Sequence, residues 1–119
     1  EQIARMTQID YDREMAFIAT APGPDGAAET LGVVRIVREA AEPSGEFAVV
    51  VRSDLKWLGL GKLLMEKAIG WARTQGLRVI AGEVLAENRP MLRFVEKLGF
   101  TLARHADDPE LLTARLQIA

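Results

Sequence analysis

The chain has 119 residues with a net charge of −2 and interspersed charges, so it fits one compact domain and offers no basic face for nucleic acid. It has no cysteine and one histidine, which excludes disulfides, a cysteine nucleophile and a multi-histidine metal site. No apolar run approaches the roughly 18 residues of a membrane span and no signal peptide is visible, so we expect a cytoplasmic protein.

The first half of the chain predicts three strands joined by short loops. Glu1–Thr7 is short, and we expect it to be the tail of a helix that begins earlier in a larger protein. Apolar, mostly β-branched runs then alternate with segments rich in Pro and Gly, a pattern typical of an antiparallel meander. The expected strands are Met15–Ala19, Leu31–Val37 and Glu46–Val51.

The second half predicts two helices among three further strands. Apolar residues recur at helical spacing from Leu60 to Trp71, and Gly76 stands where a C-terminal glycine belongs. A second helix begins after an N-cap at Asn88 and ends at Gly99. The remaining strands are Val79–Leu85, Thr101–Arg104 and Leu111–Gln117. We therefore expect an α+β fold with a mixed, mainly antiparallel sheet flanked by helices, all within residues 1–119 as a single domain.

The segment between the third strand and the first helix is a candidate phosphate-binding loop. Gly59 and Gly61 allow close approach of a ligand, and the first helical turn offers free N–H groups and a positive dipole end. Lys56 and Lys62 add positive charge. A tight strand-to-helix turn would explain the same glycines, and Leu64 replaces the third glycine of a Rossmann motif.

Two motifs in order make the chain resemble the Gcn5-related N-acetyltransferases, the GNAT superfamily. The first is Lys56-x-x-Gly59-x-Gly61, in the place of Arg/Gln-x-x-Gly-x-Gly/Ala. The second, about 30 residues later, is Asn88 followed by the phrase Val95-Glu96-Lys97-Leu98-Gly99-Phe100. This resemblance implies a GNAT fold and transfer of an acetyl group from acetyl-CoA to an amine, with acetyl-CoA as co-substrate and no metal.

A narrower resemblance is to the catalytic domain of bacterial Pat-type protein lysine acetyltransferases, which is joined to an acyl-CoA synthetase-like region in large proteins. It rests on Gln8–Met15, Glu46–Lys56 and Gly61–Met65. It implies a protein acceptor with a reactive lysine, such as an acyl-CoA synthetase. It also implies a fold lacking its first strand and most of its first helical region. A small-amine or antibiotic acetyltransferase and a non-catalytic acyl-CoA-sensing module remain open.

By resemblance, Glu46 matches a strand-borne glutamate that acts as general base. The amine needs one, because at pH 7 only about one lysine in a few thousand is neutral. Glu83 on the neighbouring strand is its rival. Backbone groups of Val49 and Val51 would contact pantetheine, and Asn88 would contact its arm or merely cap a helix. The pyrophosphate would be held by Lys56, Leu58, Gly59, Leu60, Gly61 and Lys62.

Some residues depart from the family pattern. Lys56 keeps the charge of the usual Arg but lacks its planar fork, and Val95 stands where many relatives carry a tyrosine that protonates the leaving thiolate. Tyr11, the only tyrosine, has no motif match to that role. Trp57 is either a partner contact or a surface residue. Of the remaining candidates, we expect His105 at the surface, Asp54 in a turn or cap, and Asp10, Asp12 and Glu14 at the acceptor cleft or in a solvated loop.

Overall fold

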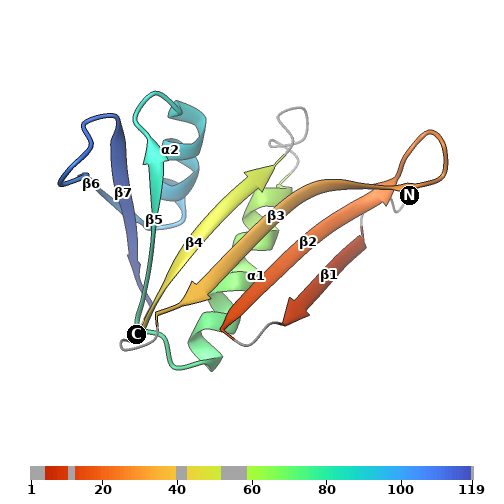
Figure 1. Ribbon diagram of the computed structural model, residues 1–119, viewed down its shortest axis with the longest axis horizontal. Helices are drawn as coiled ribbons and strands as arrows, with labels where there is room; N and C mark the ends of the chain where they lie inside the picture. The colour runs from red at the N-terminus through yellow and green to blue at the C-terminus, as the bar shows by residue number, and fades with distance from the viewer. Residues whose placement is uncertain (1–4, 11–12, 40–42, 52–58, 119) are drawn as a thin grey trace.

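The computed structural model describes residues 5–10, 13–39, 43–51 and 59–118. They form one seven-stranded sheet with two helices packed on one of its faces (Figure 1). The strands are β1 (Arg5–Asp10), β2 (Glu14–Pro22), β3 (Ala28–Arg38), β4 (Ser44–Val51), β5 (Val79–Leu85), β6 (Thr101–Arg104) and β7 (Leu111–Gln117). The helices are α1 (Leu60–Thr74) and α2 (Arg89–Lys97).

The sheet has the order β1-β2-β3-β4-β5-β7-β6. Strands β1 to β4 form an antiparallel meander, and β5, β7 and β6 form a second antiparallel group. The two groups meet at β4 and β5, which are parallel because α1 crosses over between them. Among the described strands, β4 and β5 are the one parallel pair, and the candidate site lies where they meet.

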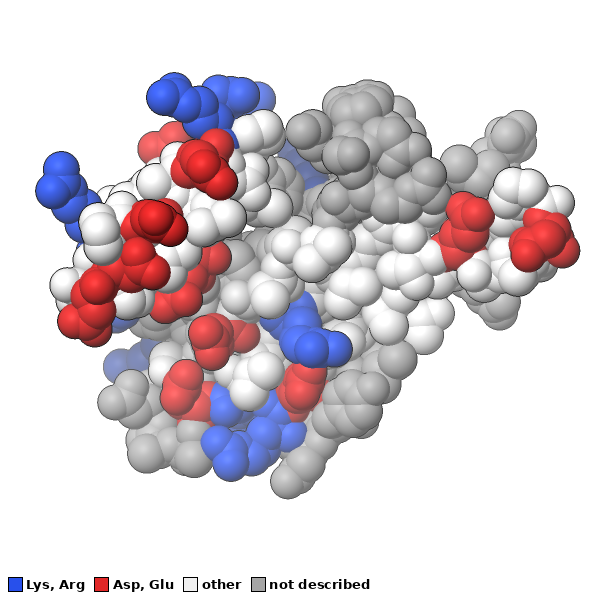
Figure 2. Space-filling model, turned by 45° about the horizontal axis from the view of Figure 1, so that its top comes forward, with Lys and Arg blue, Asp and Glu red and all other residues white. Residues whose placement is uncertain are grey.

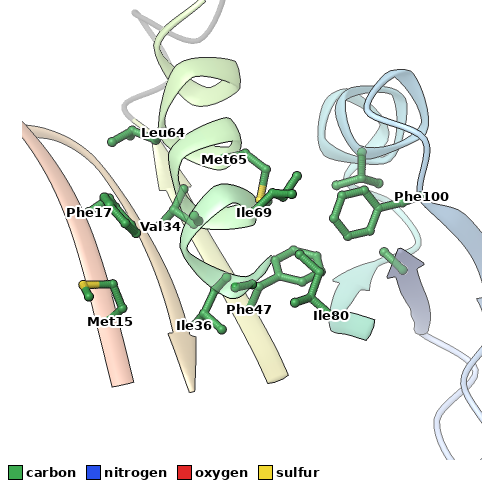
Figure 3. Close-up of a cluster of buried hydrophobic side chains, with 14 of the residues drawn as sticks. Met15, Phe17, Val34, Ile36, Phe47, Leu64, Met65, Ile69, Ile80 and Phe100 are labelled. Atoms are coloured by element: carbon green, nitrogen blue, oxygen red, sulfur yellow. The ribbon is translucent and has the colours of Figure 1, made fainter. Parts of the chain in front are cut away.

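The hydrophobic core lies between the sheet and the helices (Figure 3). On β2, β3 and β4, alternate residues point toward α1, as the period of a strand requires. Phe47 of β4 contacts Phe100 edge to face, with ring centroids 5.1 Å apart, and so joins the α1 part of the core to the α2 part. The fully buried side chains of greatest volume are Met15, Ile36, Leu64, Met65, Leu77, Ile80, Val34 and Val95.

The predicted α+β class, with its mixed and mainly antiparallel sheet, is confirmed. Every predicted strand is present, and Gly76 follows α1 with φ 77°, the left-handed conformation expected of a glycine there. The helix tail expected over Glu1–Thr7 is wrong for its described part, because Arg5–Thr7 belong to β1. Pairing of β1 with the outer edge of β2 satisfies backbone groups of both segments, and this tertiary contact outweighs local propensity.

Candidate functional site

Strands β4 and β5 run together for three residue pairs and then separate (Figure 1). The pairs are Ser44 with Val79, Gly45 with Ile80 and Glu46 with Ala81. Beyond Glu46, β4 keeps its partner β3 on one side and has no β5 partner on the other. Backbone N–H and C=O groups of alternate residues between Phe47 and Val51 are therefore available to a ligand along one edge of β4, since the others face β3.

Phe47 directly follows the last pair of β4 with β5, Glu46 with Ala81, and so lies where the two strands separate. We call this point the fork. A Cβ added to Gly82 of β5 would lie 2.7 Å from the Phe47 carbonyl oxygen and 2.8 Å from its ring. Only a glycine lets β5 pass this close to Phe47. The geometry of the fork thus depends on one aromatic ring and the glycine that faces it.

A pocket of about 280 Å³ lies where the strands meet, on the face of the sheet away from the helices. That face is assigned by alternation, since Phe47, Ile80 and Ala114 belong to the core on the helix side. Its charged lining is three carboxylates and one guanidinium, so negative charge predominates. The lining residues are Glu39, Ser44, Gly45, Glu46, Val79, Ala81, Gly82, Glu83, Thr113 and Arg115.

Glu46 and Glu83, the two candidate general bases, both line this pocket from adjacent strands. Their positions alone therefore do not distinguish which of the two carboxylates is the general base. Glu46 is exposed, and no hydrogen bond or ion pair joins its carboxylate to another residue in the described ranges. A carboxylate with free lone pairs can accept a proton from a group bound beside it.

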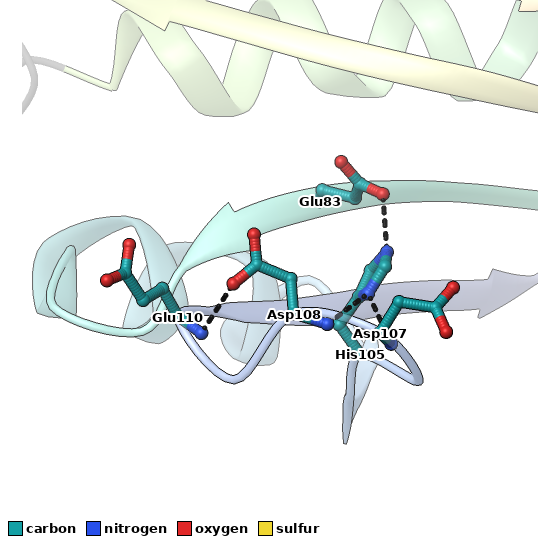
Figure 4. Close-up of polar contacts among 5 residues, drawn as sticks. All are labelled: Glu83, His105, Asp107, Asp108 and Glu110. Atoms are coloured by element: carbon teal, nitrogen blue, oxygen red, sulfur yellow. Dashed lines mark hydrogen bonds and ion pairs between the residues drawn. The ribbon is translucent and has the colours of Figure 1, made fainter.

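Glu83 is held by a histidine (Figure 4). His105 Nε2 lies 2.9 Å from Glu83 Oε2, and its Nδ1 lies 3.1 Å from the backbone nitrogens of both Asp107 and Asp108. Backbone nitrogens donate, so Nδ1 is the acceptor and Nε2 carries the proton. His105, expected at the surface near a strand end, is 22% exposed, and both of its ring nitrogens make hydrogen bonds.

The N-terminus of α1 suits an anion. No described side chain caps it, and its first turn contains no acidic residue. Gly59 precedes the helix with φ 81°, a conformation that disfavours other residues, and Gly61 is buried in the first turn while Lys62 is exposed. Of the other loop candidates, Leu60 begins the helix and is partly buried. Asp54, Lys56, Trp57 and Leu58 lie outside the described residues, as do Tyr11 and Asp12.

Asn88 caps α2, as the sequence predicted: its Oδ1 accepts a hydrogen bond from Met91 N at 3.3 Å. Val49 is partly buried on β4, and Val51 ends that strand along the open edge. Val95 is fully buried in the core, so the position of the usual tyrosine offers no polar group.

Of the acidic residues before β2, Glu14 forms an ion pair with Arg35 at 2.7 Å and Asp10 ends β1. The ion pair joins neighbouring strands and is partly exposed, so it accounts for Glu14 without a ligand.

On the face visible in Figure 2, acidic side chains gather at the left of the view, and acidic and basic side chains intermingle in the lower centre. Within the described ranges, no helix is long and apolar enough to cross a membrane. The same residues contain no group of three or more His, Asp or Glu side chains that could hold a metal ion.

The model of the acetyltransferase (GNAT) family matches residues 5–100, which include the fork, the α1 N-terminus and Asn88. The chain belongs to the GNAT acetyltransferase family. Enzymes of this family use acetyl-CoA as co-substrate.

Solved structures share this GNAT fold at low sequence identity. The GNAT domain of S. lividans PAT is 23% identical with a TM-score of 0.76, over 91% of this chain and 64% of that one. Nourseothricin acetyltransferase is 20% identical with a TM-score of 0.74, over 98% and 84%. A cAMP-binding acyltransferase from Mycobacterium smegmatis is 24% identical with a TM-score of 0.74, over 93% of this chain and 33% of that one.

Proposed function

We propose that this GNAT chain transfers the acetyl group of acetyl-CoA to the ε-amine of a lysine on a protein, such as an acyl-CoA synthetase. The observation that carries the proposal is the fork of β4 and β5, which puts an unpaired strand edge beside a carboxylate-lined pocket. The edge suits an amide-bearing co-substrate, and the pocket suits a cationic amine. Glu46 is the residue at which the two meet.

The described residues fit acetyl-CoA in two places. Backbone groups of β4 from Phe47 to Val51 can pair with the amides of pantetheine as an added strand would. The uncapped first turn of α1, at Leu60, Gly61 and Lys62, can bind the pyrophosphate through N–H groups, with Lys62 adding positive charge. We propose that Lys56, Leu58 and Gly59 complete this loop and that Asn88 contacts the pantetheine arm.

In the reaction, the free amine of lysine attacks the carbonyl carbon of the thioester, and a C–N bond forms. A β4 backbone N–H beyond Glu46 stabilises the oxygen that becomes negative, in the manner of an oxyanion hole. The Glu46 carboxylate accepts the proton that the amine nitrogen must lose. The C–S bond then breaks, and CoA leaves as a thiolate.

Protonation of that thiolate does not involve position 95. Val95 is a fully buried hydrocarbon and has no proton to give. A thiol ionises at a pKa of about 8.5, so the thiolate is a competent leaving group without a strong acid beside it. Glu46 then releases the proton that it accepted, either to water or to the sulfur, and is ready for the next turnover.

A protein acceptor is supported by the motif resemblance to Pat-type enzymes and by the fold shared with the S. lividans PAT domain. The chain spans 64% of that domain and 33% of the mycobacterial acyltransferase, so it corresponds to one part of those longer chains. We propose that, in the same way, it works within a larger cytoplasmic protein that carries an acyl-CoA synthetase-like region.

The test is acetyl transfer to a panel of acceptors. Release of CoA thiol is measured with an acyl-CoA synthetase, a lysine peptide, spermidine and nourseothricin, and mass spectrometry locates the acetyl group. We expect turnover with the protein and an acetyl-lysine in its sequence. Faster turnover with nourseothricin or spermidine would make the chain a small-amine acetyltransferase, and binding of acetyl-CoA without turnover of any acceptor would make it a sensing module.

A further inference from the structure

His105 has a bonding pattern that fixes both the chemistry and the position of its ring. Two backbone N–H groups, from Asp107 and Asp108, donate to Nδ1, each at 3.1 Å. Nδ1 therefore lacks a proton, and the neutral ring presents N–H at Nε2 alone. The backbone N–H of His105 also donates to the Leu111 carbonyl at 3.2 Å, which ties the residue into the connection between β6 and β7.

The single donor of this ring is used on Glu83. Its Nε2 lies 2.9 Å from Glu83 Oε2, and the other carboxylate oxygen points away from the ring (Figure 4). The Glu83 side chain is 49% exposed and lines the pocket that Glu46 also lines. One oxygen of Glu83 is thus held by His105, while no residue in the described part of the chain bonds the other, which can meet a ligand.

We propose that His105 is a positioning residue that acts through Glu83 on the acceptor amine. It holds the Glu83 carboxylate at the pocket, where its free oxygen binds the ammonium form of the acceptor. Glu46, to which no described residue is bonded, accepts one proton from this ammonium and releases it to water, and it then accepts the second proton, which the amine loses as the amide forms. The inference rests on the proposed function, since it assumes that the amine enters this pocket.

Two substitutions separate the two bonds of the ring. In Asn, Oδ1 stands as many bonds from Cα as Nδ1 does in His, so H105N keeps an acceptor for the loop but cannot reach Glu83. In Gln, Nε2 stands as many bonds from Cα as the ring Nε2, so H105Q keeps the donor to Glu83 and loses the loop acceptor. A purely structural histidine would be replaced well by Asn and poorly by Gln.

The kinetic test measures kcat and both KM values with acetyl-CoA and a lysine peptide. We expect H105N to raise the KM for the peptide by about two- to fivefold, as loss of a partly exposed charge contact does, with kcat and the KM for acetyl-CoA unchanged. H105Q should keep the wild-type peptide KM while its melting temperature falls. E83Q should raise the peptide KM as H105N does, and the double variant should be no worse than E83Q.

A binding test does not depend on turnover. Titration of wild-type protein with n-butylammonium, the cation of the lysine side chain, should move the amide NMR signals of Gly82, Glu83 and Thr113, whereas n-butanol should not. The Kd should rise in H105N and E83Q and stay unchanged in H105Q. If this pattern holds while no acetyl transfer occurs, the proposed function fails and the role of His105 stands. A wild-type Kd and peptide KM in H105N would overturn the inference, as would an H105Q variant as weak as H105N.

Discussion

The fork between β4 and β5 makes a specific prediction for Gly82→Ala. The new methyl group would lie 2.7 Å from the Phe47 carbonyl oxygen and 2.8 to 2.9 Å from two carbons of its ring. Contacts under 3.0 Å are essentially never adopted by a real Cβ, so something must shift. The ring is packed edge to face on Phe100 and the oxygen belongs to the backbone, so neither can move freely.

Overpacking of this kind costs about 1–3 kcal/mol, and we expect the upper part of that range because a backbone atom is involved. For a chain of 119 residues, each kcal/mol corresponds to about 4 °C in melting temperature, so Gly82→Ala should melt about 8–12 °C below wild type. Because Phe47 adjoins Glu46, the same shift should also lower kcat/KM for acetyl transfer.

Thermal unfolding gives the melting temperature and urea unfolding gives the free energy of unfolding, both followed by far-UV circular dichroism, with the slope m compared between variants. Gly70→Ala is the matched control. Gly70 lies inside α1, and nothing lies within 4 Å of its added methyl group. There the same substitution should stabilise the chain by about 0.5–1 kcal/mol, because alanine favours the helix and reduces the entropy of the unfolded state. A Gly82→Ala variant as stable as wild type would refute the argument that Phe47 and Gly82 set the fork.

Substitutions at three further positions test the site. Gly61→Val should weaken calorimetric binding of acetyl-CoA at least tenfold, about 1.4 kcal/mol, while Gly70→Val in the same helix should not; equal affinities would remove the first turn of α1 from the site. Asn88→Ala should lose about 1 kcal/mol of stability with its bond to Met91, and Asn88→Asp should keep the cap. If Asn88 also contacts pantetheine, both variants bind acetyl-CoA more weakly, and unchanged affinity would leave it a helix cap only. Glu46→Gln should lower kcat by about 10²–10⁴ with acetyl-CoA affinity unchanged, and should regain part of the loss at high pH, where free amine is abundant. Near-normal kcat in Glu46→Gln would assign the proton to another group.

The sequence predicted the elements that have strong periodicity. Helix α1 begins at the expected Leu60, and β5, β6 and β7 have the predicted bounds. In α1 an apolar stripe ends in a C-terminal glycine, and β5 is an apolar run rich in β-branched residues, so local signals and tertiary packing agree there. Strand β1 was missed because its pairing partner lies in β2, and Arg5–Asp10 shows no alternation of its own.

The site was only half visible in the sequence. Glu46 and Glu83 are 37 positions apart, and nothing local indicates that they share a pocket; that follows from the parallel pairing of β4 with β5. The contact between Glu83 and His105 is even harder to predict from the sequence. It requires β5 to pair with β7 and the β6–β7 connection to fold back, and a lone histidine carries no signal for either.

The alternation of side chains along β4 links the position of Glu46 to the packing of the core. Since successive residues of a strand face opposite sides, Phe47 enters the core while Glu46 faces the pocket, and the free edge of β4 begins between them. A slip of one residue would exchange Phe47 and Glu46, burying a carboxylate.

Two glycines oppose that slip. A Cβ at Gly45 would meet Ile36 at 2.9 Å, and a Cβ at Gly82 would meet Phe47 itself. In the observed register, glycine stands at both positions where a Cβ would collide, Gly45 beside Ile36 and Gly82 beside Phe47. The position of Glu46 is therefore enforced by hydrophobic packing on the opposite face of the sheet, so substitutions that loosen this packing should reduce catalysis without touching a polar group.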